Sequence, residues 1–478
     1  MVDVAIVGSG PNGLAAAVVM ARAGLSVQVF EAADTIGGGA RTLELTEPGY
    51  RHDWGSAVQA MAFASPFFQH FGITERVEFI VPEISYGQPL DGGRAGIAWR
   101  DIERTAEGLG RDGAAWLRLL KPLVEDARRV TEFTMSPMLP LPRHPFTALR
   151  YGLRALEQGS FLANARFSGD LAPALLAGAF AHSIGRIPSL GTASAGLLLA
   201  TLAHDGGWPI PVGGSQAMTD AMVSDLQAHG GTVETGHRIF SVDELPQARA
   251  VFFDTSAGQL LDIAGGRLAP GYRRALGRFR YGNAASKVDF ALSGPVPWAN
   301  EDLRAAGTIH VGGTRAEVAA GEAAVAGGRY PELPYVLASQ PTVFDPSRAP
   351  AGGHTLWTYT HVPAGSDRDM TEPVTAQIER FAPGFRDVIV ASSALPATAI
   401  ERGNPNFVGG DIAGGAADFL QLIVRPVLSS KPWRSAPGLY LCSASAVPGP
   451  GVHGLGGYQA ARLALREVFG LPLPSLAP

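Results

Sequence analysis

The strongest restriction on the fold of this chain comes from its N-terminal segment. Val4 to Val7 is a short apolar run of strand type, and the glycine-rich turn GSGPNG follows it at residues 8–13. Residues 14–25, LAAAVVMARAGL, have the length and small-residue composition of a helix. Glu31 then ends a second strand-like run, about 20 residues after the glycines, where an acidic side chain can accept hydrogen bonds from an adenosine ribose. This order predicts a Rossmann-type dinucleotide-binding unit.

Each glycine of the turn has its own expected role. Gly8 makes the tight turn, Gly10 lets a pyrophosphate approach the backbone, and Gly13 lets the helix pack closely on the strand. Pro11 and Asn12 begin the helix, where free N–H groups and the positive helix end face the phosphates. An ordinary tight turn is the alternative interpretation, because a glycine pattern alone is a weak signal.

A glycine triplet with an arginine follows directly, in the segment AADTIGGGART at residues 32–42. This segment resembles the second nucleotide-contact segment of the flavoprotein superfamily that includes amine oxidases and phytoene desaturases. The resemblance implies that Gly38, Gly39 and Arg41 run beside the pyrophosphate and ribityl chain of FAD, and arginine offers a charged fork for phosphate oxygens. It also implies contacts for the neighbouring Ala32 and Ala40. A glycine loop with a solvated arginine is the alternative.

The C-terminal segment repeats the order of strand, loop and helix. GLYLC at residues 438–442 is strand-like, residues 443–457 form a loop rich in glycine and proline, and a helix is expected from about residue 458 to residue 469. A helix N-terminus here suits the flavin edge that becomes negative on reduction. The cofactor contacts expected from this loop are Ser445, Gly454, Leu455 and Gly456. A purely structural C-terminal helix is the alternative.

Two longer stretches make the resemblance more specific. LYLCSASAVPGPGVHGLGGYQAARLAL from Leu439 and NPNFVGGDIAGGAADFLQLIVRPV from Asn404 are similar to the phytoene-desaturase-like family. Within it, the phytoene dehydrogenase-related proteins often labelled pyridine nucleotide-disulphide oxidoreductase domain-containing are most similar, over nearly the whole chain. Ser443, where the family commonly has glycine, and Ala444, which cannot supply the carboxylate of amine oxidases, favour the desaturase side.

One FAD held by both chain ends requires a discontinuous domain. The expected fold class is α/β, with a Rossmann-like FAD-binding domain at residues 1–70, 206–272 and 428–478. A mixed α+β substrate domain with an apolar helical part is expected at residues 71–205 and 273–427. In the middle of the chain we expect strands at residues 232–234, 238–242 and 250–254, and the resemblance places the backbone of Ile239 at the adenine.

The expected substrate domain contains several apolar segments. Residues 135–161 are rich in proline, methionine and aromatic residues, while residues 171–184 and 190–203 are apolar all round. Such helices either belong to the ordinary core or form the wall of an apolar tunnel or lid. In a variant of the second interpretation, the lid also rests on a membrane. Trp357 and Tyr359 alternate in a strand-like run and either line a substrate pocket or belong to the core.

Composition excludes several classes of function. The net charge of −5, with 17% charged residues, gives no positive field for nucleic acid. The single cysteine, Cys442, excludes a dithiol pair and multi-cysteine metal sites, and we expect no metal. A second dinucleotide fingerprint is absent from the sequence, so the electron acceptor is open between oxygen, a quinone and a visiting nicotinamide. The oligomeric state is not indicated.

Acid–base candidates are few. His453 in the C-terminal loop is either a structural hydrogen-bonding residue or a proton shuttle. The further candidates are Lys287, His310, His361, Tyr458 and Gln459.

The sequence therefore predicts an FAD-dependent oxidoreductase that introduces or removes a C–C double bond in a lipophilic, isoprenoid- or carotenoid-like substrate, by hydride transfer to or from flavin N5. An oxygen-using amine or alcohol oxidase and a non-catalytic flavin-fold interaction protein are the alternatives. The N-terminus lacks the pattern of a signal peptide, and uninterrupted apolar runs of spanning length are absent from the sequence. We expect a cytoplasmic location, with peripheral membrane contact left open.

Overall fold

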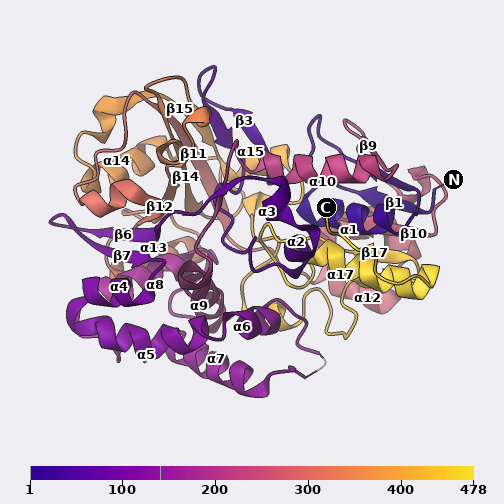
Figure 1. Ribbon diagram of the computed structural model, residues 1–478, viewed down its shortest axis with the longest axis horizontal. Coiled ribbons are helices and arrows are strands. Elements are labelled where there is room, and N and C mark those ends of the chain that lie inside the picture. Colours follow the sequence, from indigo (N-terminus) through magenta and orange to yellow (C-terminus); the bar gives the residue numbers. More distant parts are fainter. Residues whose placement is uncertain (1, 140) are drawn as a thin grey trace.

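The computed structural model describes residues 2–139 and 141–478 of the chain, which form two lobes (Figure 1). In one lobe, six strands of the described residues form a sheet in the order β16-β17-β10-β1-β2-β9. The five strands from β17 to β9 in this order run parallel to one another, and the edge strand β16 is antiparallel to β17. The bounds are β1 (Val4–Val7), β2 (Val27–Phe30), β9 (Thr232–Glu234), β10 (Ala250–Phe253), β16 (Arg434–Ala436) and β17 (Leu439–Leu441). The two ends of the chain and its middle thus share one sheet, and the α/β fold class is as predicted.

Helix α1 (Pro11–Arg22) is buried along most of its length. Gly10 is its N-cap and Pro11 its first residue, where the missing N–H of proline costs nothing. Its alanine and valine side chains suit close packing on all sides, because α10 (Gln216–Ala228) and α17 (Leu455–Ala464) both lie against it. The small residues predicted to form a helix therefore do so, at the centre of the lobe.

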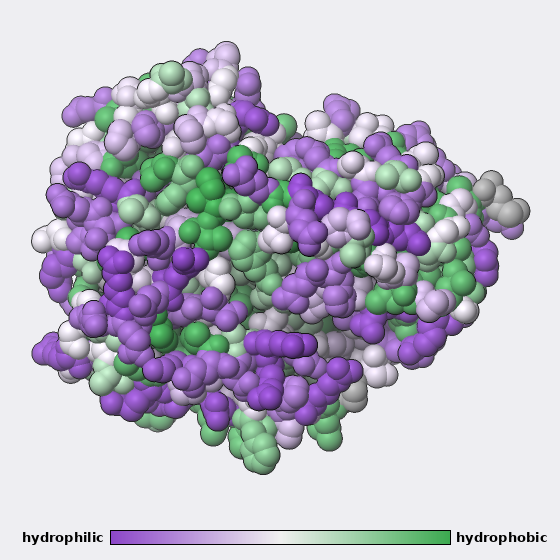
Figure 2. Space-filling model, viewed as in Figure 1, coloured by the Kyte–Doolittle hydropathy of each residue, from purple (hydrophilic) through white to green (hydrophobic). Residues whose placement is uncertain are grey.

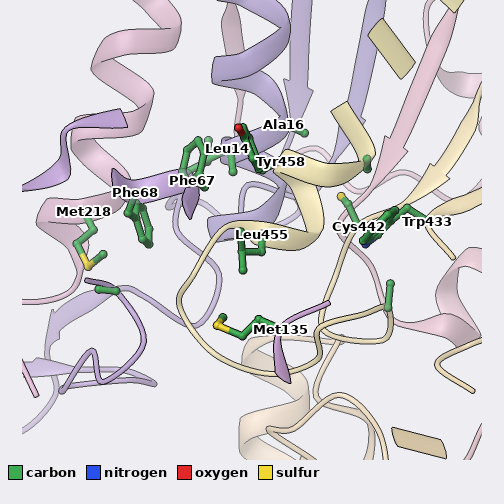
Figure 3. Close-up of a cluster of buried hydrophobic side chains, with 14 of the residues drawn as sticks. Leu14, Ala16, Phe67, Phe68, Met135, Met218, Trp433, Cys442, Leu455 and Tyr458 are labelled. Atoms are coloured by element: carbon green, nitrogen blue, oxygen red, sulfur yellow. The ribbon is translucent and has the colours of Figure 1, made fainter. Parts of the chain in front are cut away.

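A cluster of larger side chains fills the space where α17 meets α1 and α2 (Pro66–Phe71). Figure 3 shows Leu14 of α1 beside Phe67 of α2 and Tyr458 of α17. The ring centroids of Phe67 and Tyr458 are 5.8 Å apart, and both rings are buried. The C-terminal helix is thus held in the core by apolar burial, the main source of folding free energy.

In the second lobe, seven strands of the described chain form a mixed sheet in the order β15-β11-β14-β13-β12-β6-β7. Its central strands β11 and β14 are buried on both faces. On one face of the sheet, α14 and its N-cap contribute Met370, Val374 and Ile378 to an apolar cluster. Helix α8 (Leu171–Ala181) contacts β6, β7 and β12, and α13 contacts β14. The bounds are β6 (Ile84–Leu90), β7 (Arg94–Trp99), β11 (Ala284–Leu292), β12 (Ala306–Val311), β13 (Val336–Ser339), β14 (His354–Val362), β15 (Ile389–Leu395), α13 (Arg315–Ala326) and α14 (Thr371–Phe381).

A group of helices lies below this sheet in Figure 1. They are α4 (Ile102–Gly108), α5 (Gly113–Val124), α6 (Ala127–Thr134), α7 (Pro145–Gln158), α8 (Leu171–Ala181) and α9 (Leu190–Asp205). The apolar segments predicted at residues 171–184 and 190–203 form α8 and α9. Helix α8 is buried from Ala172 to Ala181, because α9, α13 and the sheet surround it. No helix of the described residues is long and apolar enough to cross a membrane.

The remaining elements are short connections. They are β3 (Thr42–Glu44), β4 (Arg51–Asp53), β5 (Phe79–Ile80), β8 (Ile210–Pro211), α3 (Ile73–Arg76), α11 (Ala257–Ala264), α12 (Pro270–Gly277), α15 (Ala397–Gly403) and α16 (Phe419–Ile423).

One expected strand is wrong. Residues 238–241 are irregular, and a 3-10 turn begins at Val242 and ends at Glu244. The side chain of Ser241 caps this turn, and the N–H of Phe240 donates to the Glu244 carboxylate at 3.0 Å. These local bonds compete with a sheet ladder.

A buried ion pair joins the β3–β4 hairpin to the second lobe. Arg348 donates from Nη2 to Asp53 Oδ2 at 2.7 Å, and both side chains are fully buried. The other carboxylate oxygen of Asp53 accepts from Thr42 Oγ1 and from the N–H of Ser215, each at 2.8 Å. The Asp53 carboxylate therefore links the hairpin to the segments of Arg348 and Ser215. Loss of the Arg348 guanidinium would leave its buried negative charge unpaired.

We expect Arg348→Met to lower the free energy of unfolding by about 3–5 kcal/mol, because it removes one partner of a buried pair. Urea unfolding followed by tryptophan fluorescence measures this. Arg386→Met, which removes the exposed pair with Glu372, is the control and leaves the midpoint nearly unchanged. Equal effects of the two substitutions would contradict the structural role of the buried pair.

Candidate active site

A cavity of about 640 Å³ lies at the carboxyl ends of the parallel strands and extends into the second lobe. Open α/β sheets bind ligands at this edge. Its walls come from both ends of the chain and from the mixed sheet. The predicted site residues among them are Gly8, Gly10, Pro11, Asn12, Glu31, Ala32, Gly38, Gly39, Ala40, Arg41, Ile239, Trp357, Tyr359, Ser445 and His453. The structure thus brings together residues that are more than 400 positions apart in the sequence.

The glycine turn forms a cradle without room for side chains. Gly8 has a φ of +99°, which favours glycine. A Cβ on Gly13 would collide with the carbonyl oxygen of Gly8, so this glycine permits the close approach of α1 to the turn. A Cβ on Gly38 would lie 3.1 Å from the Cα of Gly10. The two glycine segments therefore face each other backbone to backbone, which fits a dinucleotide pyrophosphate.

Glu31 is fixed at the end of β2. Its Oε2 accepts from the N–H and the hydroxyl of Ser9 at 2.8 and 2.6 Å, and its Oε1 accepts from the N–H of Ala33 at 2.8 Å. These bonds hold the carboxylate in the cavity wall. This position fits the predicted acceptor for ribose hydroxyls.

Arg41 lies beside the glycine triplet, nearly buried. It donates from Nε to the carbonyl oxygen of Gly38 at 2.8 Å and from Nη2 to that of Gly403 at 3.0 Å, with Trp54 beneath its guanidinium. Burial lowers its pKa, and arginine nevertheless keeps its charge at neutral pH. The residue therefore supplies a fixed positive charge in the wall of the cradle, as a phosphate requires.

The C-terminal loop forms the opposite wall. Ser445 donates to the carbonyl oxygen of Gly414 at 3.0 Å. The buried Arg425, whose pKa burial lowers to about 10, donates to the carbonyl oxygens of Ala444 and Ala413 at 2.8 and 2.6 Å. This loop is therefore held rigidly by hydrogen bonds to a neighbouring segment.

His453 uses both ring nitrogens inside this loop. The N–H of Leu455 donates to Nδ1 at 3.1 Å, so Nε2 carries the proton and faces the carbonyl oxygen of Gly449 at 3.2 Å. Burial lowers the pKa of His453 to about 4, which keeps the ring neutral. Of the two roles left open for this residue, the arrangement supports the structural one.

Four predicted contacts lie behind the cavity wall rather than in it. Gly13 packs within α1, and Gly454, Leu455 and Gly456 form the cap and first turn of α17. The N–H of Gly456 donates to Asn12 Oδ1 at 3.1 Å. Gly13 and Gly456 thus shape the site by packing, and direct cofactor contact of these four residues stays a prediction.

The part of the cavity in the second lobe is a mainly apolar chamber. Trp357 and Tyr359 point to the same side of β14 because they are two residues apart. The cavity wall also contains apolar and aromatic side chains that the sequence did not single out, namely Tyr151, Leu198, Leu199, Trp208 and Leu337. We define these seven residues as the aromatic chamber.

Polar groups in the chamber wall are few. Lys287 is bound to the carboxylate of Asp289, two residues further along β11, and burial lowers the pKa of this lysine. His182 lies with Nε2 2.9 Å from Nε2 of His310, and burial lowers the pKa of His182 to about 3. Among the described residues, the carboxylates in the cavity wall are Glu31 and Asp254, both in the dinucleotide cradle. The chamber therefore offers no counter-ion to a cationic substrate from these residues.

Asp254 is a site residue that sequence reasoning missed. It follows β10, and its Oδ2 accepts from the N–H of Gly13 at 2.8 Å. Burial, together with the negative charge of Glu31, raises the pKa of Asp254 to about 7. Its place at the carboxyl end of a parallel strand was the available signal, since such strand ends meet at one edge of the sheet.

The raised pKa of Asp254 predicts a pH-dependent stability. Between about pH 4 and pH 7 the folded protein keeps a proton there that the unfolded chain releases, so stability falls as pH rises through this window. Asp254→Asn removes the ionisable group, and the amide oxygen of the asparagine can still accept from the N–H of Gly13. As the pH rises from 5 to 8, the free energy of unfolding of the wild type should therefore fall relative to that of the variant, by on the order of 3 kcal/mol.

Urea unfolding at the two pH values measures this difference. The exposed Asp262→Asn serves as the control and should show no such pH dependence. A relative stability of Asp254→Asn that is unchanged between pH 5 and pH 8 would contradict the buried, proton-binding carboxyl.

Comparisons with known proteins agree with the fold. Residues 6–70, which contain the glycine turn, match the family described as NAD(P)-binding Rossmann-like domain. The rat protein named pyridine nucleotide-disulfide oxidoreductase domain-containing protein 2 is 24% identical and covers 98% of this chain and 94% of its own. A putrescine oxidase variant has a TM-score of 0.62 at 15% identity, with 98% and 99% coverage. A putative protoporphyrinogen oxidase from Exiguobacterium has a TM-score of 0.54 at 15% identity, with 98% and 99% coverage.

The two solved structures share the fold along their whole length. The resemblance found in the sequence motifs is thereby confirmed. The chain thus contains a Rossmann-like dinucleotide-binding segment and is similar over nearly its whole length to the relatives named pyridine nucleotide-disulfide oxidoreductase domain-containing protein 2.

Proposed function

We propose that this protein is an FAD-dependent oxidoreductase that introduces or removes a C–C double bond in a lipophilic, isoprenoid- or carotenoid-like substrate. The observation that carries the proposal is the single cavity in which the glycine cradle and the aromatic chamber adjoin. A substrate in the chamber would lie beside the cofactor in a mainly apolar space. FAD, when bound, supplies the N5 atom that accepts or donates a hydride.

In this proposal the residues of the chain bind the cofactor and position the substrate. Gly8, Gly10, Gly38 and Gly39 leave backbone surface for the pyrophosphate, Glu31 accepts from the ribose, and Arg41 neutralises phosphate charge. The discontinuous FAD-binding domain proposed at residues 1–70, 206–272 and 428–478 brings these groups to the loop that follows β17. The substrate domain, proposed at residues 71–205 and 273–427, supplies most of the aromatic chamber, and Trp208 comes from the segment 206–272.

The chamber favours a substrate without positive charge. Trp357 and Tyr359 offer apolar ring surface, and the polar side chains of the same cavity wall include Lys287 and His182. A protonated amine would enter without a carboxylate partner in the described wall and would pay the cost of a buried, unpaired charge. This supports the proposed desaturase or saturase over the alternative, an amine or alcohol oxidase. The structural neighbour named putrescine oxidase keeps that alternative as an outcome of the test.

The same architecture bears on how an electron acceptor would reach the flavin. Among the described residues, one sheet, that of β1, is of the dinucleotide-binding type. The proposed acceptor, which is oxygen, a quinone or a nicotinamide, therefore approaches the flavin without a second nucleotide-binding domain.

Cofactor binding is tested by one substitution. A Cβ on Gly10 would lie 2.5 Å from Asp254 Oδ2 and would fill the cradle, so Gly10→Val should abolish the yellow colour of the purified protein. Gly271→Val in α12, where a Cβ meets nothing within 4 Å, is the matched control and should keep the colour. Visible spectra with the protein-to-flavin ratio measure both.

A fully yellow Gly10→Val protein would show that the cradle is assigned wrongly. A wild-type protein that stays colourless after FAD is added would favour the non-catalytic interaction protein.

Substrate class is tested separately, by anaerobic titration of the yellow protein. Bleaching of the flavin absorbance by a lipophilic polyene precursor, or reoxidation of reduced protein by a polyene for the reverse reaction, is the expected result. Trp357→Ala should slow this step by at least about tenfold, because the ring that positions the substrate is lost. Flavin reduction by amines with release of peroxide in air, and none by polyenes, would contradict the proposal.

A further inference from the structure

Helix α7 and its two flanking segments expose apolar side chains to solvent. Phe146 is 83% exposed, and Leu141 before the helix and Phe161 after it are 85% and 93% exposed. The exposed large apolar residues of this region are Met138, Leu139, Leu141, Phe146, Leu149, Leu153, Leu156, Phe161 and Leu162, which we call the α7 patch. More such residues lie here than in the rest of the described chain together. Figure 2 shows apolar side chains projecting at the lower edge, where Figure 1 places α7.

The apolar residues of α7 occupy its outer face. Phe146, Leu149, Leu153 and Leu156 follow each other at spacings of three and four, so they lie on one side of the helix. The opposite side carries the buried residues Thr147, Tyr151, Ala155 and Gln158. An amphipathic helix on a protein surface normally turns its apolar side inward. In α7 an apolar face points outward, which marks an interaction surface.

The segment that carries the α7 patch has an excess of positive charge, although Arg143 pairs with Glu132 of α6 at 3.3 Å and Arg154 and Arg166 pair with Glu157. Residues 141–166 contain four arginines, Arg143, Arg150, Arg154 and Arg166, and one acidic residue, Glu157. This contrasts with the net charge of −5 of the whole chain. Arg143 and Arg150 are exposed beside the apolar side chains. Apolar residues flanked by arginine are typical of helices that lie in the interface of an anionic membrane.

The inner side of the same region forms part of the cavity. Tyr151 of α7 lines it together with Thr134 and Met135 at the end of α6. The hydroxyl of Tyr151 is bound to the carbonyl oxygen of Ser194 in α9, which is also in the wall. The solvent-facing patch and the wall of the aromatic chamber are therefore opposite sides of one helical layer.

We infer that the α7 patch docks on the surface of an anionic lipid bilayer, with α7 lying in the headgroup region. Helix α7 has 14 residues and is too short to span a membrane, so the contact is peripheral. Docking brings the cavity wall at α6 and α7 close to the acyl chains, from which a lipophilic substrate reaches the chamber. The entry of a lipophilic substrate from the membrane rests on the proposed function. The docking itself rests on the exposed apolar side chains and the arginines of the α7 segment.

A second copy of the chain fits the patch less well. A symmetric dimer places the same surface of both copies face to face, so both halves of the contact would carry the same excess of arginine. Anionic headgroups neutralise these arginines instead, while the acyl region takes up the leucine and phenylalanine side chains.

Flotation of the yellow full-length protein with liposomes tests the inference. Vesicles of phosphatidylcholine with phosphatidylglycerol should carry the protein to the top of the gradient, and vesicles of phosphatidylcholine alone should carry less. Leu149→Ser with Leu153→Ser should lower the floating fraction at least about tenfold, because two apolar anchors are lost. Leu333→Ser with Val390→Ser removes two similarly exposed apolar side chains elsewhere and is the matched control, with unchanged flotation.

Charge is tested with Arg143→Glu and Arg150→Glu in one protein. This variant should lose the preference for anionic vesicles, and high salt should weaken the wild type in the same way. Unchanged yellow colour and circular dichroism of each variant establish that it is folded.

Two results would overturn the inference. One is wild-type protein that stays at the bottom of the gradient with both kinds of vesicle. The other is a wild-type dimer in solution that Leu149→Ser with Leu153→Ser converts to a monomer, which would assign the patch to a second copy. The proposed function fails separately: protein that floats but reacts with no lipophilic substrate contradicts the chemistry and leaves the docking standing.

Discussion

The site depends on the close contact between helices α1 and α17. A Cβ at Gly457 would collide with the carbonyl oxygen of Asn12, and a Cβ at Gly456 would collide with that of Cys442. Without side chains at these positions, the helices approach backbone to backbone, and the N–H of Gly456 reaches the side chain of Asn12. The first and last helices therefore begin at the same edge of one sheet. Both of their N-terminal loops then line one cavity.

The second requirement is a fixed relation between the two lobes. The Asp53–Arg348 pair joins the β3–β4 hairpin to the segment after β13, and Asp53 also accepts the N–H of Ser215 before α10. The chamber is built from residues of the mixed sheet and of α7 and α9, so its position relative to the glycine cradle depends on contacts of this kind. A buried pair that loses one partner is costly, which makes the cluster sensitive to substitution.

Local sequence signals predicted the cradle well, because its geometry is set within a few residues. The strand, the glycine turn, α1 and the acidic Glu31 are close in sequence, and each glycine has a steric reason. Ile239 was expected in a strand and is instead in an irregular segment, since the side chains of Ser241 and Glu244 bond to the local backbone. The pairing of His182 with His310 and of Asp254 with the turn at Gly13 joins residues more than 120 positions apart. Such contacts depend on tertiary packing and leave no periodic signal in one sequence.

We propose that the two ends of the chain enclose one FAD between them, and a crystal structure of the yellow protein will reveal where the cofactor lies. We expect density for the adenosine beside Glu31 and Ile239, for the pyrophosphate between Gly10 and Gly38, and for the flavin ring against residues 443–453 and the aromatic chamber. Flavin density elsewhere, or a cradle in contact with no cofactor in crystals that contain FAD, would contradict it.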